Sequence, residues 1–121
     1  MVHKKALIVD DDARNIFALK AVLKARGYHC LSASSMSEAF DMLLSADDVG
    51  VVLMDMMMPE MDGYEGIAKI GEAGIKVPVI AITAQAMPGD REKCLEAGAE
   101  DYISKPVDID KLEPLLKAYL K

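Results

Sequence analysis

The chain has 121 residues, 52% of them hydrophobic, which is enough for one domain with its own core and argues against a disordered chain. Its 14 basic and 20 acidic side chains give a net charge of −6, which argues against direct nucleic-acid binding because such binding relies on basic patches. No apolar run approaches the roughly 20 residues that span a bilayer, so residues 1–121 are expected to form one cytoplasmic domain without a membrane contact.

The first half of the chain alternates apolar runs with amphipathic stretches. Residues 6–9 predict a buried strand, and 28–33 predict a less apolar strand at an edge of the sheet. Between them, a helix is predicted over 14–26 from an apolar stripe made of Ile16, Leu19, Val22 and Leu23. A second helix follows, with an expected buried stripe of Met36, Ala39, Phe40, Leu43 and Leu44.

An uninterrupted apolar run at 51–54 predicts a central strand that is buried on both faces. The run ends abruptly in Asp55, after which Pro59 and Gly63 predict a loop. Three helices and two strands complete the chain: a helix at 64–71, a strand at 77–82, a helix between Pro88 and Gly98, a strand at 101–104 and a helix at 109–120. This alternation predicts an α/β fold with a parallel sheet and helices on both faces.

Polar side chains follow four of the five predicted strands: Asp10, Asp11, Asp55, Thr83 and Lys105. Because the carboxyl ends of parallel strands lie at one edge of a sheet, we expect these side chains to converge there. Taken singly, an acidic turn with Asp12 as helix cap, a threonine ending a strand or a surface lysine is an ordinary structural feature. The expected convergence of all five at one edge of the sheet is what favours a functional site.

The chemistry of such a cluster points to metal-dependent phosphoryl transfer. Neighbouring carboxylates repel one another unless a cation neutralises them, and oxygen ligands without His or Cys suit Mg²⁺. An Asp that attacks phosphorus forms an acyl phosphate, whose charge needs a metal, a cation and a hydroxyl donor. These roles fit Asp55 as nucleophile, Asp10 and Asp11 on the metal, Lys105 as cation and Thr83 as donor. Without metal, Asp11→Asn is expected to stabilise the fold by about 1 kcal/mol.

Four stretches resemble the receiver domain of two-component response regulators, also called the chemotaxis-Y-like fold: residues 7–12, 53–63, 80–84 and 97–106. They occur in the order and at the spacing of that family, and the resemblance covers essentially the whole chain. It implies a five-stranded parallel sheet with strand order 2-1-3-4-5, in a (βα)5 flavodoxin-like doubly wound sandwich.

The resemblance implies that Asp55 accepts a phosphoryl group from a histidine kinase or a histidine phosphotransfer protein. It implies Mg²⁺, or Mn²⁺ as a substitute, held directly by Asp11, Asp55 and the backbone carbonyl of Met57, with Asp10 acting mostly through water. The protein would be a signalling switch that catalyses only its own phosphorylation and dephosphorylation, and not an enzyme with turnover.

The resemblance also implies a conformational response. Thr83 and Tyr102 would switch together on phosphorylation, while Lys105 and the backbone of Ala84 stabilise the phosphoryl group. Their movement would remodel the face formed by the fourth helix, fifth strand and fifth helix, which binds a downstream protein and can also carry a homodimer. The peptide bond before Pro106 would be cis, which an X-Pro bond permits at small cost.

Two further positions tune the phosphoryl lifetime in this family, and here they are Met57 and Gln85. Met57 offers no side-chain hydrogen bond to a hydrolytic water, so we predict slow self-dephosphorylation. Decay of the phosphorylated protein should therefore change in Met57→Asn, and an unchanged rate would contradict the prediction.

Three other functions share some of these features. A phosphohydrolase of the haloacid dehalogenase type also forms an aspartyl phosphate, but it carries a second Asp two residues later, where this chain has Met57. A phosphorylation-independent interaction module conflicts with the intact set of site residues. A flavodoxin-like cofactor carrier fits the fold, but crowded acids would repel a phosphate-bearing ligand unless a metal intervened.

The two cysteines, Cys30 and Cys94, lack the spacing of a metal or redox motif, and we expect them as small buried side chains in a reducing compartment. Residues 10–15 and 105–108 resemble receivers of hybrid kinases. Whether the chain is a stand-alone regulator or part of a longer regulator or hybrid kinase stays open here, as do its kinase and its target.

Overall fold

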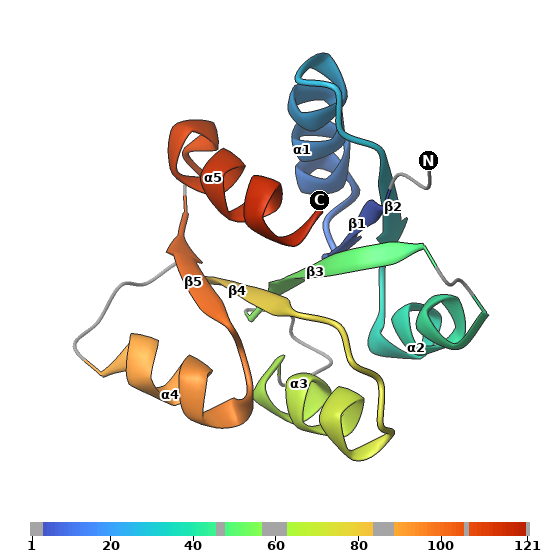
Figure 1. Ribbon diagram of the computed structural model, residues 1–121, viewed down its shortest axis with the longest axis vertical. Helices are drawn as coiled ribbons and strands as arrows, with labels where there is room; N and C mark the ends of the chain where they lie inside the picture. Colours follow the sequence, from blue (N-terminus) through green and yellow to red (C-terminus); the bar gives the residue numbers. More distant parts are fainter. Residues whose placement is uncertain (1–3, 46–47, 57–62, 84–88, 106, 121) are drawn as a thin grey trace.

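A computed structural model describes residues 4–45, 48–56, 63–83, 89–105 and 107–120. Strands and helices alternate along these residues (Figure 1). The strands are β1 (Lys5–Val9), β2 (Cys30–Ala33), β3 (Val49–Asp55), β4 (Val79–Thr83) and β5 (Asp101–Ser104). The helices are α1 (Ala13–Ala25), α2 (Met36–Ser45), α3 (Gly63–Glu72), α4 (Asp90–Ala97) and α5 (Ile109–Tyr119).

The five strands form one sheet in the order β2-β1-β3-β4-β5, and every neighbouring pair is parallel. This confirms the predicted α/β fold and its strand order, with the less apolar β2 at an edge. Val9 of β1 lies opposite Met54 of β3, so the residues after them, Asp10 and Asp55, lie at the same level at the carboxyl edge of the sheet.

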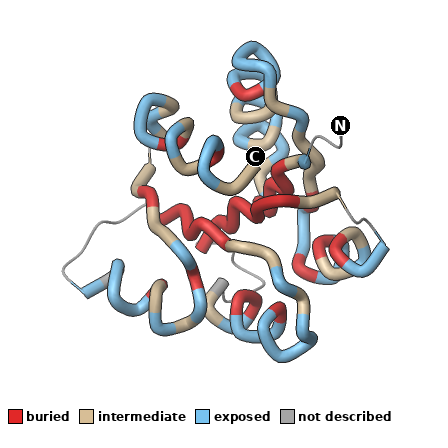
Figure 2. The backbone as a smooth tube through the Cα atoms, in the orientation of Figure 1, coloured by how far each residue is buried: buried red, intermediate tan, exposed pale blue. Residues whose placement is uncertain are grey.

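Helices cover both faces of the sheet: α1 and α5 lie on one side, and α2, α3 and α4 lie on the other (Figure 1). Each side has its own apolar core, one built around Leu23, Leu112 and Leu116 and the other around Met36 and Ile67. The central strands separate the two cores and are buried along nearly their whole length (Figure 2). The carboxyl ends of β1, β3 and β4 are therefore held by packing on both faces of the sheet.

Helix ends follow the predicted signals. The Asp12 side chain accepts a hydrogen bond from the backbone nitrogen of Arg14 at 2.9 Å and so caps α1. Gly27 follows the end of that helix with φ of +90°, which favours glycine. At the start of α2, the Ser35 hydroxyl accepts from the backbone nitrogen of Glu38 at 3.2 Å.

Two apolar side chains predicted to be buried are exposed. Val22 on α1 is 43% exposed and Leu44 on α2 is 70% exposed. The buried stripe of α2 runs through Met36, Ala39 and Leu43, and Leu44 lies one position further around the helix. Val22 borders a cavity beside the sheet, which keeps its side chain accessible.

Among the described residues, no helix has the length and apolar character needed to cross a membrane.

Candidate functional site

The predicted site residues gather at the carboxyl edge of the sheet, and backbone hydrogen bonds hold the strand exits there. The nitrogen of Asp10 donates to the carbonyl of Ala33 at 3.1 Å, beyond the end of β1. At the other side, the nitrogen of Lys105 donates to the carbonyl of Thr83 at 2.7 Å. Backbone hydrogen bonds alone thus fix the positions of the residues at these strand ends.

Three carboxylates form the centre of this edge. Asp10, Asp11 and Asp55 each offer an oxygen atom, and these atoms all lie within 4.8 Å of one another. Asp10 and Asp55 are buried, at 6% and 4% exposure, whereas Asp11 is exposed. Two of the acids therefore belong to the protein interior, and the third faces water. All three offer only oxygen atoms as ligands, which fits a hard divalent cation such as Mg²⁺.

Asp10 is the acid whose ionisation is most affected by its surroundings. Burial raises the pKa of Asp10, and the nearby Asp55 carboxylate raises it further. The backbone nitrogen of Asp12 donates to Asp10 Oδ1 at 2.9 Å, and this hydrogen bond and the Lys105 charge act in the opposite direction. Because the raising effects prevail, the metal-free site binds a proton at Asp10 more readily than an exposed Asp does.

Lys105 supplies the cation that the sequence predicted. Its Nζ lies 3.2 Å from Asp55 Oδ2, with the Asp55 side chain almost fully buried and Lys105 about a quarter exposed. Thr83, the last residue of β4, is buried at the same edge. The structure thus brings Asp10, Asp11 and Asp55 together with Lys105, and it places Thr83 on the neighbouring strand end.

Tyr102 is another predicted site residue that the structure describes. It is half-buried in β5, opposite Ala81 of β4, and it packs against the core on the side of α2, α3 and α4. Four other predicted site residues lie outside the described residues: Met57, Ala84, Gln85 and Pro106. The carbonyl ligand, the backbone donor, the lifetime positions and the cis peptide therefore stay predictions.

Sequence reasoning missed Asn15 and the cavity beside the acids. Asn15 lies on the first full turn of α1 and lines this cavity together with Asp10, Asp55 and Lys105. The signal was available, because Asn15, Leu19 and Val22 are spaced at i, i+4 and i+7 and so share one face of the helix. The apolar stripe predicted for α1 began at Ile16, and the side of the helix that lines the cavity also includes the preceding polar residue, Asn15.

Comparison with known proteins decides the family. The sequence profile of the response regulator receiver domain matches residues 6–117. The chain belongs to this family of signalling domains. The membership agrees with the phosphorylation-dependent switch of two-component systems and disfavours the phosphohydrolase and the phosphorylation-independent module. Receiver domains use Mg²⁺ at an acidic pocket, and the cluster of Asp10, Asp11 and Asp55 is a pocket of that kind.

Relatives include both long and short proteins. The chain is 37% identical over 113 residues to the sensor histidine kinase RcsC of Salmonella typhi, covering 93% of this chain but only 12% of that kinase. It is 36% identical over 119 residues to the polar-differentiation response regulator DivK of Brucella ovis, covering 97% of this chain and 96% of DivK.

Solved structures share the fold. A Francisella response regulator receiver domain superposes with a TM-score of 0.88 at 26% identity, over 97% of this chain and 96% of that one. A receiver domain protein from Methanospirillum hungatei superposes with a TM-score of 0.84 at 30% identity, over 97% and 93%.

Proposed function

We propose that Asp55 accepts a phosphoryl group from the phosphohistidine of a histidine kinase or phosphotransfer protein, in a reaction that this domain catalyses on itself. The observation that carries the proposal is the 3.2 Å contact between Lys105 Nζ and Asp55 Oδ2 inside a cluster of three carboxylates. A lysine ammonium beside a buried carboxylate, with two more acids to hold a cation, is the arrangement that phosphoryl transfer to an acid needs.

Each residue has a distinct part in the proposed reaction. A carboxylate oxygen of Asp55 forms a bond to phosphorus while the bond from phosphorus to the donor imidazole nitrogen breaks, and the imidazole leaves with that electron pair. Lys105 offers its ammonium to the phosphoryl oxygens, and Thr83 offers its hydroxyl at the neighbouring strand end. Asp10, Asp11 and Asp55 would hold Mg²⁺, which supplies positive charge to the phosphoryl oxygens.

The response to phosphorylation is proposed to run through β4 and β5. Thr83 and Ser104 are register partners, and Tyr102 precedes Ser104 by two residues on the same strand. A Thr83 side chain drawn toward the phosphoryl group alters the packing available to Tyr102, and through it the face formed by α4, β5 and α5. We propose this face for the downstream partner, with residues 1–121 acting as one receiver domain in the cytoplasm.

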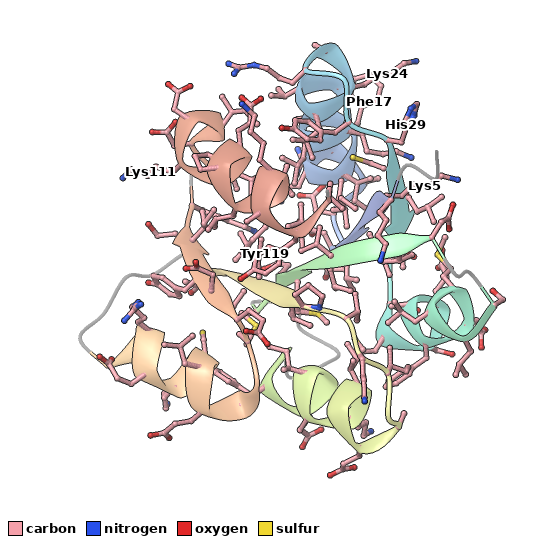
Figure 3. The ribbon with its side chains drawn as sticks, viewed as in Figure 1. Lys5, Phe17, Lys24, His29, Lys111 and Tyr119 are labelled. Carbon is pink, nitrogen blue, oxygen red and sulfur yellow. The ribbon has the colours of Figure 1, made fainter. Side chains whose placement is uncertain are left out.

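Helix α1 offers a surface for the phosphodonor. It begins directly after the acids, and residues 13–37 carry four basic and no acidic side chains, a net charge of +4 in a chain whose net charge is −6. Phe17 on this helix is 76% exposed, and both Phe17 and Lys24 project from α1 (Figure 3). An exposed aromatic side chain among positive charges is complementary to a phosphodonor protein whose binding surface has an apolar pocket surrounded by acidic residues.

The proposal is tested by intact mass after incubation with Mg²⁺ and a small phosphodonor such as acetyl phosphate. Wild type is expected to gain one phosphoryl group and Asp55→Asn none. Asp12→Asn is the matched control, because Asp12 is a neighbouring acid that caps α1 outside the cluster, and it should gain the group as wild type does. A gain that persists in Asp55→Asn contradicts the assignment of the acceptor.

A further inference from the structure

A cavity of about 540 Å³ lies between α1, the sheet and the start of α5. Its walls are apolar along most of their length: Ile8, Leu53 and Ile82 from the strands, Ala18, Leu19 and Val22 from α1, and Val107 and Ile109 just before and at the start of α5. Polar side chains occur at one end, where Asp10, Asn15, Asp55 and Lys105 line it. The cavity is therefore amphipathic, with a long apolar body and a charged end.

The helix above this cavity is incompletely packed. Leu23 on α1 is fully buried, but Leu19 is only half-buried and Val22 is 43% exposed, although both belong to the apolar stripe that faces the sheet. Apolar surface that remains in contact with water favours a ligand that covers it. The exposure of the stripe is a second sign, besides the cavity, that this side of the sheet has room for an apolar group.

The volume is in the range of small-molecule sites, which are mostly apolar with a few polar groups that fix orientation. A cavity of about 150 Å³ is enough to hold benzene. A space of about 540 Å³ accommodates an aromatic ring together with a short alkyl chain.

The charges at the polar end select the ligand. Two buried carboxylates, Asp10 and Asp55, lie there with one ammonium, that of Lys105, so the end carries a formal charge of −1. A carboxylate or phosphate head group would meet two like charges and one ammonium, whereas an amine would meet two carboxylates and one like charge, so the net charge of −1 favours the amine. We propose that this cavity binds small amphipathic amines, with the ammonium at Asp10 and Asp55 and the apolar body beneath Leu19 and Val22.

One consequence rests on the proposed function. The ammonium would occupy the carboxylate oxygens that would otherwise hold the divalent cation, so amine and Mg²⁺ should compete, and a bound amine should slow phosphorylation of Asp55. Binding itself does not depend on that function, since it requires only the cavity and its two buried acids.

The test uses three probes with one apolar body: 4-phenylbutylamine, 4-phenylbutanol and 4-phenylbutyrate. Titrations of the whole chain in metal-free buffer at neutral pH are followed by amide NMR shifts. The amine should bind saturably, shift Leu19, Ile82 and Val107, and bind about ten-fold more tightly than the alcohol, while the carboxylate should not bind. Equal affinity for amine and alcohol, or no saturable shift at these residues, overturns the proposal.

Matched variants locate the site. Ala18→Phe places a ring in the cavity and should weaken amine binding at least about ten-fold. Ala21→Phe adds the same ring to an exposed position of α1 that does not line the cavity, and it should leave binding unchanged. Val107→Phe replaces Ala18→Phe if the latter does not fold.

Equal amine binding by the cavity-filling variant and Ala21→Phe refutes the site. Because these titrations contain neither metal nor phosphodonor, they distinguish failure of the cavity from failure of Asp55 as acceptor, which is measured separately by intact mass.

Discussion

At the scale of single residues, the main result is that the three acids of the site are not equivalent. The sequence assigned both Asp10 and Asp11 to the metal, with Asp10 acting mostly through water, but it gave no sign that the two differ in burial. The structure buries Asp10 and leaves Asp11 exposed, so water screens the charge of Asp11 far better. The stabilisation expected from removing one like charge therefore belongs at Asp10 more than at Asp11.

In metal-free buffer at pH 7, Asp10→Asn should stabilise the fold by about 1 kcal/mol, because it removes a buried charge that faces Asp55. The amide oxygen can still accept from the backbone nitrogen of Asp12. The folded state raises the pKa of Asp10, so wild type loses stability as pH rises from the unfolded value of 3.8 through the folded pKa. The advantage of the variant should accordingly shrink as pH falls toward 3.8.

Thermal melts between pH 3 and pH 8 check this prediction, with Asp12→Asn as the control. The neighbouring Arg14 lowers the pKa of Asp12, so removal of that charge should bring no gain in stability. With Mg²⁺ added, wild type should be stabilised more than Asp10→Asn, because the variant has lost one of the three carboxylates. A variant that is less stable than wild type at pH 7 without metal would show that the Asp10 charge is not costly.

At the scale of elements, the strands were predictable and the outer surfaces of the helices were less so. The runs at 6–9 and 51–54 identify buried strands because side chains on both faces must be apolar, and an acid directly afterward marks the edge. An apolar stripe on a helix predicts the buried side chains less precisely, because successive residues are rotated by only about 100° around the helix axis. Tertiary packing then decides which residues at the border of the stripe are buried. Leu44 illustrates this on α2, and Val22 shows that packing on α1 stops short of filling the space below it.

Substitution of Phe17 separates partner docking from phosphoryl chemistry. Phe17→Ala should slow phosphotransfer from a phosphohistidine protein about ten-fold, because truncation of an exposed aromatic anchor costs binding energy of that order. Phosphorylation by acetyl phosphate should not change, since Phe17 lies outside the acid cluster.

Rates of phosphate transfer from both donors check this prediction. Leu44→Ala, which removes an equally exposed apolar side chain from α2, is the control for a general loss of surface hydrophobicity. If Phe17→Ala slowed phosphorylation equally with both donors, Phe17 would contribute to the fold or to the reaction itself and not to docking of the phosphodonor protein.

At the scale of the whole molecule, residues far apart in the sequence tie the segment between α1 and β2 to α5. Arg26 Nη1 lies 2.7 Å from Glu113 Oε1, and the Tyr28 hydroxyl lies 3.2 Å from Glu113 Oε2. Glu113 is the more buried partner and interacts with both. None of these contacts was predicted from the sequence, because nothing in the spacing of residues 87 and 85 positions apart reveals that they meet.

Glu113→Gln should lower the free energy of unfolding by about 1 kcal/mol, because the charge that pairs with Arg26 is lost while the shape of the side chain is kept. Chemical denaturation measures the effect, and added salt should reduce the difference because Arg26 is partly exposed. Lys117→Gln is a matched control, since the Lys117 side chain is exposed and its nitrogen lies 4.0 Å from Glu113, so it should contribute far less. Equal losses in the two variants would refute a special role for Arg26.

The separation between strand ends and helix exteriors has a consequence for how such a protein diversifies. Every residue of the acid cluster comes from a strand end, while Phe17 and the positive charges around it come from the outside of a helix. The Francisella receiver domain keeps the same backbone at a TM-score of 0.88 although only 26% of residues are identical. If α1 binds the phosphodonor as proposed, a few substitutions on α1 after gene duplication give a copy a new donor while its phosphoryl chemistry stays intact. Insulation between parallel signalling pathways would then require changes on one helix, without any rebuilding of the reaction site.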